Sequence, residues 1–284
     1  MSAVGFIGLG NIGAPMARRL VDWPDGLVVF DVRAEATAPF VDRGAVASAS
    51  PAELANSADR ICVVVQNEQQ VRDVVLGADG IAEGAAAGTV VAVHSTISAE
   101  GAESIAADAA ERGVAVVDAP VSGGGMGAHE GTLAVMLGGD DDAVGRITPV
   151  LERFASMVQH MGPVGAGTRT KIARNLITFA SFAVVGEAQR LADAAGLDLA
   201  KLGEVVRHSD GVTGGAGAVM LRPSSGVMAD DDGLRAIFEH TATLGTKDLE
   251  LARHLGAELG VHTPFAELAE ARLRSALGLD PEPS

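Results

Sequence analysis

The stretch Ala3-Val-Gly-Phe-Ile-Gly8-Leu-Gly10-Asn-Ile-Gly13-Ala-Pro-Met-Ala-Arg-Arg-Leu20 decides the fold of this chain. Its first five residues are uncharged and mostly apolar, which is typical of a strand buried on both faces of a sheet. Three glycines follow at G-x-G-x-x-G spacing. In a dinucleotide-binding turn the first glycine allows the tight bend, the second lets the backbone approach a pyrophosphate, and the third lets helix and strand pack closely. The stretch therefore predicts a strand, a glycine turn and a helix; the alternative is a purely structural turn.

A second apolar run, residues 27–30, ends at Asp31, 18 residues after Gly13. An acidic residue about 20 residues past the glycines binds the ribose 2′-hydroxyl of NAD in such folds. The helix that opens near Asn11 would direct unpaired N–H groups and about half a positive charge at the phosphates. This context favours a dinucleotide site. Arg33 could instead pair with the 2′-phosphate of NADP, so NAD is the expected cofactor and NADP the alternative.

Apolar runs and helical segments alternate through the first half of the chain. Strand character recurs at 60–65, 89–94, 114–117 and 133–137, and helices are expected at 34–43, 51–56 and 98–112. This alternation predicts a doubly wound α/β sheet of the Rossmann type. The expected ligand site lies beyond the carboxyl ends of its strands.

A glycine-rich stretch at 162–167 marks the domain boundary. Beyond it strand signals vanish, and helices are expected at 168–195, 199–208, 234–256 and 264–277. The sequence thus predicts a dinucleotide-binding domain at 1–163 and an all-helical domain for substrate binding and oligomerisation at 164–284. A long interdomain helix is expected to join them.

The overall composition excludes several classes of protein. The 284 residues include 21 Lys or Arg against 37 Asp or Glu, a net charge of −16, which disfavours nucleic-acid binding. Cys62, the single cysteine, lies in an apolar run and is expected to be a buried thiol; no disulfide or metal site is expected. No signal peptide or membrane span is recognised, so a cytoplasmic location is expected.

Two further stretches carry unusual residues. Ser122-Gly123-Gly124 lies in a glycine-rich segment that could form a nest of N–H groups around an anion, or a flexible hairpin loop. Lys171 and Asn175 share one stripe of an otherwise apolar helix. A lysine buried there would be costly unless it is paired or used. The alternative is a lysine at the helix start with its ammonium in water.

Four motifs occur in order along the chain. They are Gly8-Leu-Gly-Asn-Ile-Gly-Ala-Pro-Met-Ala17, the block from Asp118 to Leu133, Gly165-Ala-Gly-Thr-Arg-Thr-Lys-Ile-Ala-Arg-Asn175, and Lys247-Asp-Leu-Glu-Leu-Ala252. Together they resemble the β-hydroxyacid dehydrogenase family over the whole chain. This family includes 3-hydroxyisobutyrate dehydrogenase and tartronate semialdehyde reductase, and it is related to phosphogluconate dehydrogenase.

The resemblance implies a role for each matching residue. Lys171 would be the catalytic acid/base, and Ser122, Gly123 and Gly124 would hold the substrate carboxylate. Asn175 and Asp248 would also bind substrate, and Arg174 and His240, where this chain departs from the family, would lie at the substrate as well. The implied cofactor-binding residues are Gly8, Leu9, Gly10, Asn11, Ile12, Gly13, Asp31, Val32, Arg33, Val65, Gln66, Thr96 and Lys247.

The resemblance also implies the reaction. A hydride would pass between a nicotinamide and a small 3-hydroxy acid, or its semialdehyde, in a homodimer or homotetramer. The alternatives are a reductase of tartronate or succinic semialdehyde and a catalytically silent dinucleotide sensor. Arg174 replaces the usual first Asn of the family's pair, Gln66 a common Pro, and His240 a usual aromatic residue, so the substrate stays open.

Overall fold

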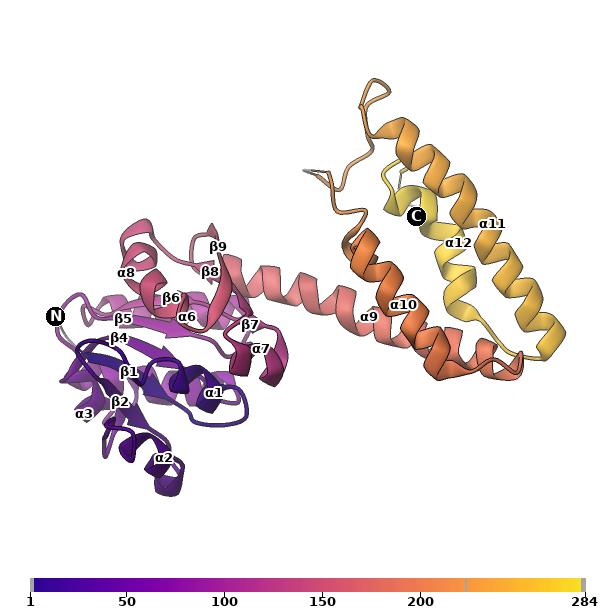
Figure 1. The fold of residues 1–284 in the computed structure, drawn as a ribbon. Coiled ribbons are helices and arrows are strands. Elements are labelled where there is room, and N and C mark those ends of the chain that lie inside the picture. Colours follow the sequence, from indigo (N-terminus) through magenta and orange to yellow (C-terminus); the bar gives the residue numbers. More distant parts are fainter. Residues whose placement is uncertain (1–2, 223, 282–284) are drawn as a thin grey trace. The chain divides into compact units, whose positions relative to one another are not determined.

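The computed structural model describes residues 3–222 and 224–281, so the outer ends of both predicted domains lie outside the described residues. The chain divides into two units, 1–174 and 175–284 (Figure 1). The first unit carries a sheet with helices on both faces. The second is helical.

Nine strands form one sheet among the described residues, in the order β3-β2-β1-β4-β5-β6-β8-β7, with β9 paired to β8. The strands are β1 (Ala3–Ile7), β2 (Leu27–Phe30), β3 (Val46–Ala47), β4 (Ala58–Val63), β5 (Val90–Val93), β6 (Ala115–Asp118), β7 (Val121–Ser122), β8 (Leu133–Gly138) and β9 (Ala155–Gly162). The six strands from β1 to β6 pair in parallel with their neighbours in the sheet, whereas β8 runs antiparallel to β6 and β7. The order 3-2-1-4-5-6 is that of a Rossmann sheet, whose chain reverses its direction of winding between β1 and β4.

Alternate residues of the central strands enter two separate cores. Phe6, Cys62 and Ala92 belong to the core beneath α1 and α8. Ile7, Ile61 and Val63 belong to the core beneath α3, α4 and α6. Because both faces are covered, these strands consist of unbroken apolar runs. The buried strands predicted from the sequence are confirmed.

The helices of the first unit are α1 (Gly13–Arg18), α2 (Ala38–Val41), α3 (Pro51–Ala55), α4 (Glu68–Leu76), α5 (Ile81–Gly84), α6 (Ala99–Ala110), α7 (Gly124–Glu130) and α8 (Asp141–Leu151). Ser50 and Ser98 cap α3 and α6 by accepting N–H groups of the first turn. The helix expected at 34–43 is instead a 3₁₀ turn, Ala34–Ala36, followed by the short α2. The hairpin-loop alternative is wrong for residues 124–130, which form α7.

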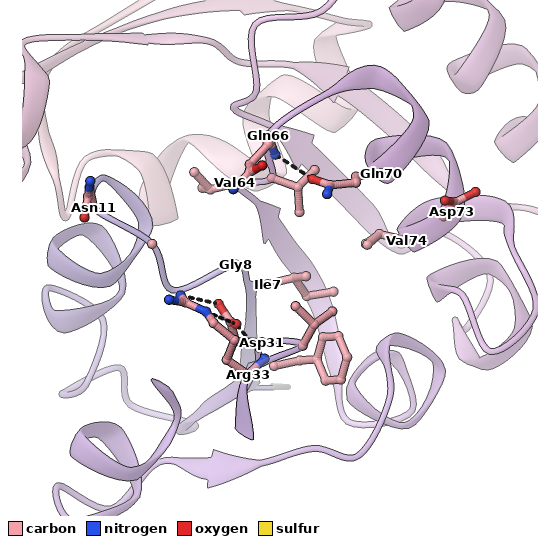
Figure 2. A pocket seen from close by; sticks show the side chains of 14 residues that line it. Ile7, Gly8, Asn11, Asp31, Arg33, Val64, Gln66, Gln70, Asp73 and Val74 are labelled. Carbon is pink, nitrogen blue, oxygen red and sulfur yellow. Dashed lines mark hydrogen bonds and ion pairs between the residues drawn. The ribbon is translucent and has the colours of Figure 1, made fainter. Parts of the chain in front are cut away.

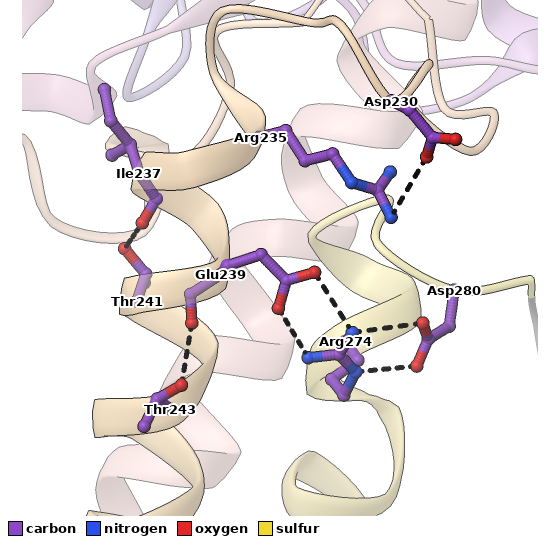
Figure 3. Close-up of polar contacts among 8 residues, drawn as sticks. All are labelled: Asp230, Arg235, Ile237, Glu239, Thr241, Thr243, Arg274 and Asp280. Carbon is purple, nitrogen blue, oxygen red and sulfur yellow. Dashed lines mark hydrogen bonds and ion pairs between the residues drawn. The ribbon is translucent and has the colours of Figure 1, made fainter.

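The second unit is built on α9, which begins in the first unit. Its elements are α9 (Ala166–Ala194), α10 (Leu199–Thr213), a 3₁₀ turn (Gly215–Gly217), α11 (Arg235–Leu259) and α12 (Pro264–Ala276). Glu187 of α9 is buried and accepts the N–H groups of Phe265 and Ala266 at 2.9 Å each, which caps α12. Arg274 of α12 forms ion pairs with Glu239 of α11 and with Asp280 (Figure 3). None of the helices within 3–222 and 224–281 is both long and apolar enough to cross a membrane.

Candidate functional site

The glycine turn after β1 has one glycine for each requirement of a dinucleotide site. Gly8 has φ +93°, and a Cβ there would overlap the carbonyl oxygen of Val64. A Cβ on Gly13 would overlap the carbonyl oxygen of Gly8. At Gly10 a Cβ would meet no atom within 4 Å. Gly8 and Gly13 are therefore required by the fold, whereas the bare backbone of Gly10 leaves free space.

That free space belongs to a pocket of about 570 Å³ at the carboxyl ends of β1, β2 and β4. Its lining consists of Ile7, Gly8, Gly10, Asn11, Phe30, Asp31, Val32, Arg33, Val64, Val65, Gln66, Gln70, Asp73 and Val74. Asp31 and Arg33 lie on one side, and Gln66 and Gln70 lie on the other, joined by a hydrogen bond (Figure 2). The pocket occupies the position where the sheet reverses its winding, which is where such folds bind ligands.

Asp31 is held in place by its own neighbours. Its Oδ2 accepts the Leu9 N–H at 2.7 Å, and its Oδ1 accepts the Arg33 N–H at 2.9 Å. The Arg33 guanidinium also pairs with Oδ1 at 3.2 Å. Burial raises the pKa of Asp31, but the hydrogen bonds from Arg33 and Leu9 outweigh it, so the pKa lies below its usual value. A carboxylate held by hydrogen bonds to both of its oxygens, two of them from the exposed Arg33 side chain, thus lies at one end of the pocket.

The pocket residues fit a dinucleotide cofactor. The backbone at Gly10 leaves room for a pyrophosphate to approach, and Asp31 offers an acceptor for a ribose hydroxyl. Of the predicted cofactor residues, Leu9 is buried in the core, and Ile12 packs against that core and precedes α1. Helix α1 begins at Gly13, slightly later than the expected opening near Asn11.

Lys171 lies in the second turn of α9, where its side chain is partly buried. Burial lowers its pKa, and the positive charge of Arg174 on the same helix lowers it further. Both effects favour the neutral amine. Apolar side chains of the same helix, such as Leu176 and Phe179, are 71% and 62% exposed.

Ser122 is the last residue of β7, and Gly123 and Gly124 follow with φ +132° and +64°. Thr96 is exposed, in a connection between β5 and α6 whose residues Ser95 and Ile97 are buried. Its neighbour Ser95 accepts the Val65 N–H at 2.9 Å and donates to the Val65 carbonyl at 2.7 Å, which ties the ends of β4 and β5 together.

The remaining predicted residues lie on the helices α9 and α11. Arg174 is the last residue of the first unit, and Asn175 begins the second. His240, Lys247 and Asp248 lie on α11, where Lys247 Nζ and Asp248 Oδ1 are 3.2 Å apart.

Sequence reasoning missed the contribution of α4 to the pocket. Gln70, Asp73 and Val74 all line it from this helix. A signal was present, because Asn67 stands just before the helix and caps it by accepting the Gln70 N–H at 2.9 Å.

Two family models together match nearly the whole chain. The NAD binding domain of 6-phosphogluconate dehydrogenase matches residues 3–162. The NAD-binding domain of NADP-dependent 3-hydroxyisobutyrate dehydrogenase matches residues 165–281. This chain belongs to the β-hydroxyacid dehydrogenase family. The resemblance stated from the four motifs is confirmed, and with it a Rossmann sheet followed by a helical region.

Curated relatives align along nearly the full length of the chain. An uncharacterized oxidoreductase of Mycobacterium tuberculosis is 52% identical over 99% of this chain and 96% of its own. The NAD-dependent L-serine dehydrogenase of Pseudomonas aeruginosa is 36% identical over 98% and 93%. The 3-hydroxyisobutyrate dehydrogenase of the same organism is 34% identical over 95% and 90%.

Solved structures of similar proteins share the fold of this chain. The crystal structure of a protein from Mycobacterium avium 104 matches with a TM-score of 0.93 and 46% identity, covering 98% of this chain and 99% of that one. Mycobacterium tuberculosis 3-hydroxyisobutyrate dehydrogenase with L-serine matches at a TM-score of 0.68 and 30% identity, covering 96% and 92%. As a member of the family, this chain is an NAD(P)-dependent oxidoreductase that acts on CH–OH groups.

Proposed function

We propose that this enzyme oxidises a small 3-hydroxy acid to its semialdehyde, or catalyses the reverse reduction. The observation that carries the proposal is a partly buried lysine, Lys171, whose pKa is lowered, in a chain whose pocket fits a dinucleotide. Two relatives are named for L-serine and 3-hydroxyisobutyrate. Both compounds carry a carboxylate and a hydroxyl on the carbon two bonds away. A substrate of this class is therefore the first to test.

The residues of this chain divide the chemistry between them. A bound oxidised nicotinamide supplies the hydride acceptor. As the carbinol C–H bond breaks, the neutral amine of Lys171 takes the hydroxyl proton, and a carbonyl forms. In reduction the Lys171 ammonium returns the proton to the carbonyl oxygen. The lowered pKa favours the neutral form that oxidation needs.

Substrate orientation is assigned by family motif. Ser122 would donate its hydroxyl to the substrate carboxylate, with the backbone N–H groups of Gly123 and Gly124 as further donors. Asn175 would orient the reacting hydroxyl. Arg174, His240 and Asp248 would shape the selection of the acid, and Thr96 and Lys247 would lie toward the nicotinamide.

We propose NAD as the preferred cofactor. Asp31 can accept from the ribose 2′-hydroxyl, and its negative charge repels a 2′-phosphate. Arg33 is paired with Asp31 at 3.2 Å, which supports a role in fixing that carboxylate.

Assembly, domain limits and location are also proposals. The exposed apolar side chains of α9, including Leu176, Phe179 and Phe182, support a homodimer or homotetramer in which a second copy covers them. The division into domains 1–163 and 164–284 and a cytoplasmic location stay predictions.

The experiment is a panel of short 3-hydroxy acids and semialdehydes with NAD and NADP, followed at 340 nm. Replacing Lys171 by Ala should lower kcat at least about 10²-fold while NAD still binds. Lys171→Arg should be equally poor, because a guanidinium keeps its proton. A variant with turnover within a few-fold of the parent would refute the role. A flat panel with tight NAD binding would favour the dinucleotide sensor, and activity with semialdehydes alone would favour a reductase.

A further inference from the structure

The start of α9 is held by a buried carboxylate that the proposed reaction does not use. Asp118 ends β6 and is 1% exposed. Its Oδ1 accepts the Gly165 N–H at 2.7 Å, and its Oδ2 accepts the Thr168 N–H at 2.6 Å. N–H groups in the first turn of a helix have no partner within the helix, and a negative charge there complements the helix dipole. One oxygen of Asp118 thus binds the residue just before α9, and the other binds the first turn of the helix.

Two glycines bring that turn onto the sheet itself. A Cβ on Gly167 would overlap the carbonyl oxygen of Met136, and a Cβ on Gly138 would overlap the carboxylate of Asp118. No side chain therefore separates the first turn of α9 from the ends of β6 and β8. The backbone packing and the two hydrogen bonds fix the same turn.

Asp118 also lies on the strand that leads to the proposed carboxylate site. Four residues beyond it, Ser122 ends β7, and β8 holds the connection through Met136 N–H to the Pro120 carbonyl at 3.1 Å. Lys171 follows Thr168 by three residues, about one helical turn. One carboxylate thus joins the segment of Ser122 to the segment of Lys171.

We propose that Asp118 is a positioning residue for hydride transfer, which it serves by fixing the Lys171 amine relative to Ser122 through the amides of Gly165 and Thr168. The inference rests on the proposed function. An error of about 1 Å in such positioning can cost about 10²-fold in rate. Loosening the turn would also expose the partly buried Lys171 to water, and its pKa would then rise toward its ordinary value. Charged groups near this turn include Arg174 and Arg169, which pairs with Glu103 of α6 at 2.8 Å.

The test uses two variants that disturb the turn in different ways. Asp118→Asn keeps one acceptor oxygen but sets an NH₂ group against the second backbone N–H. Gly167→Ala leaves the carboxylate intact and forces the turn away from β8. The matched controls are Asp140→Asn, at the aspartate that caps α8, and Gly145→Ala in α8, where a Cβ meets no atom within 4 Å.

The measurements are kcat against pH, the Kd for NAD, the melting temperature, and amide hydrogen exchange at Gly165 and Thr168. Both test variants should lose about 10- to 100-fold in kcat with NAD affinity within about threefold of the parent. Their ascending pH limb should move to higher pH, and the two amides should exchange faster. The controls should keep the kcat, the limb and the exchange of the parent.

The outcomes separate the two proposals. Parent-like kcat in Asp118→Asn beside an inactive Lys171→Ala overturns the positioning role alone. A fall in kcat matched by a loss of folded protein, with the pH limb unmoved, also overturns it. Full activity of Lys171→Ala overturns the proposed function, and the positioning role falls with it. If Asp118→Asn does not fold, Gly167→Ala decides by the same measurements.

Discussion

Asp31 and Arg33 form an ion pair in which Arg33 orients the carboxylate and Asp31 holds the guanidinium. The guanidinium of Arg33 lies 3.2 Å from Asp31 Oδ1 and is still more than half exposed. Arg33 could bind a 2′-phosphate only if Asp31 neither paired with the guanidinium nor repelled the phosphate. We therefore expect cofactor choice to depend on the charge of Asp31.

Asp31→Asn should shift that choice toward NADP. Losing a hydrogen bond to a charged group costs about 1.5–3 kcal/mol, so kcat/KM with NAD should fall about 10- to 100-fold. The freed Arg33 should raise kcat/KM with NADP. The ratio of the two values is the measurement, and Asp25→Asn in the exposed turn before β2 is the control. An unchanged ratio would count against the role of Asp31.

Arg174 acts on Lys171 through its charge. A neighbouring cation disfavours the protonated amine, which lowers the pKa of Lys171. In Arg174→Asn that repulsion is gone, so the pKa of Lys171 should rise. In the proposed mechanism oxidation uses the neutral amine, which is populated above this pKa. The ascending limb of kcat should therefore move to higher pH.

The control for this shift is Arg190→Gln, which removes a cation elsewhere on α9. A limb that stays in place in Arg174→Asn, or moves equally in the control, would contradict the assignment. The same variant tests selectivity, because a changed preference among hydroxy acids would support Arg174 as a substrate-binding residue.

At the scale of elements, the glycine turn separates a folding requirement from a binding requirement. Gly8→Ala would force a Cβ onto the Val64 carbonyl at a positive φ, so its melting temperature should fall. Gly10→Ala meets open space and should fold like the parent, but its methyl group would enter the space that a pyrophosphate needs. NAD affinity measured by titration should weaken at least tenfold in Gly10→Ala with little change in melting temperature. Strong NAD binding by this variant would refute the assignment of Gly10.

Elements with a long or continuous pattern could be predicted from the sequence. Local signals mark the apolar runs of β1 and β4, the helix expected at 98–112, which is α6, and the extent of α9. The two-residue strands β3 and β7 are too short for periodicity to mark them. In α7, a run of glycines concealed a helix that tertiary contacts stabilise.

At the scale of the whole molecule, the sequence indicated the division into a sheet-containing part and a helical part, because strand signals stop near Gly162. It could not show that Asp118 serves a helix almost 50 residues later, since that contact depends on how β6, β8 and the start of α9 meet. The pocket shows the same limit. Gly10 and Asp31 were predicted from motif spacing, whereas Gln70 and Asp73 became part of it only through the placement of α4.

The buried thiol of Cys62 can report on local opening of the sheet in this enzyme. This thiol is the only one in the chain, is fully buried on β4, and has its pKa raised by burial, so a disulfide reagent can reach it only when the sheet opens. Labelling of the native enzyme should be at least about 10³-fold slower than in urea. Saturating NAD should slow it further, by about 100-fold at 100 times Kd if opening abolishes binding. Equal labelling rates with and without NAD would mean that β4 opens without disturbing the pocket at its carboxyl end.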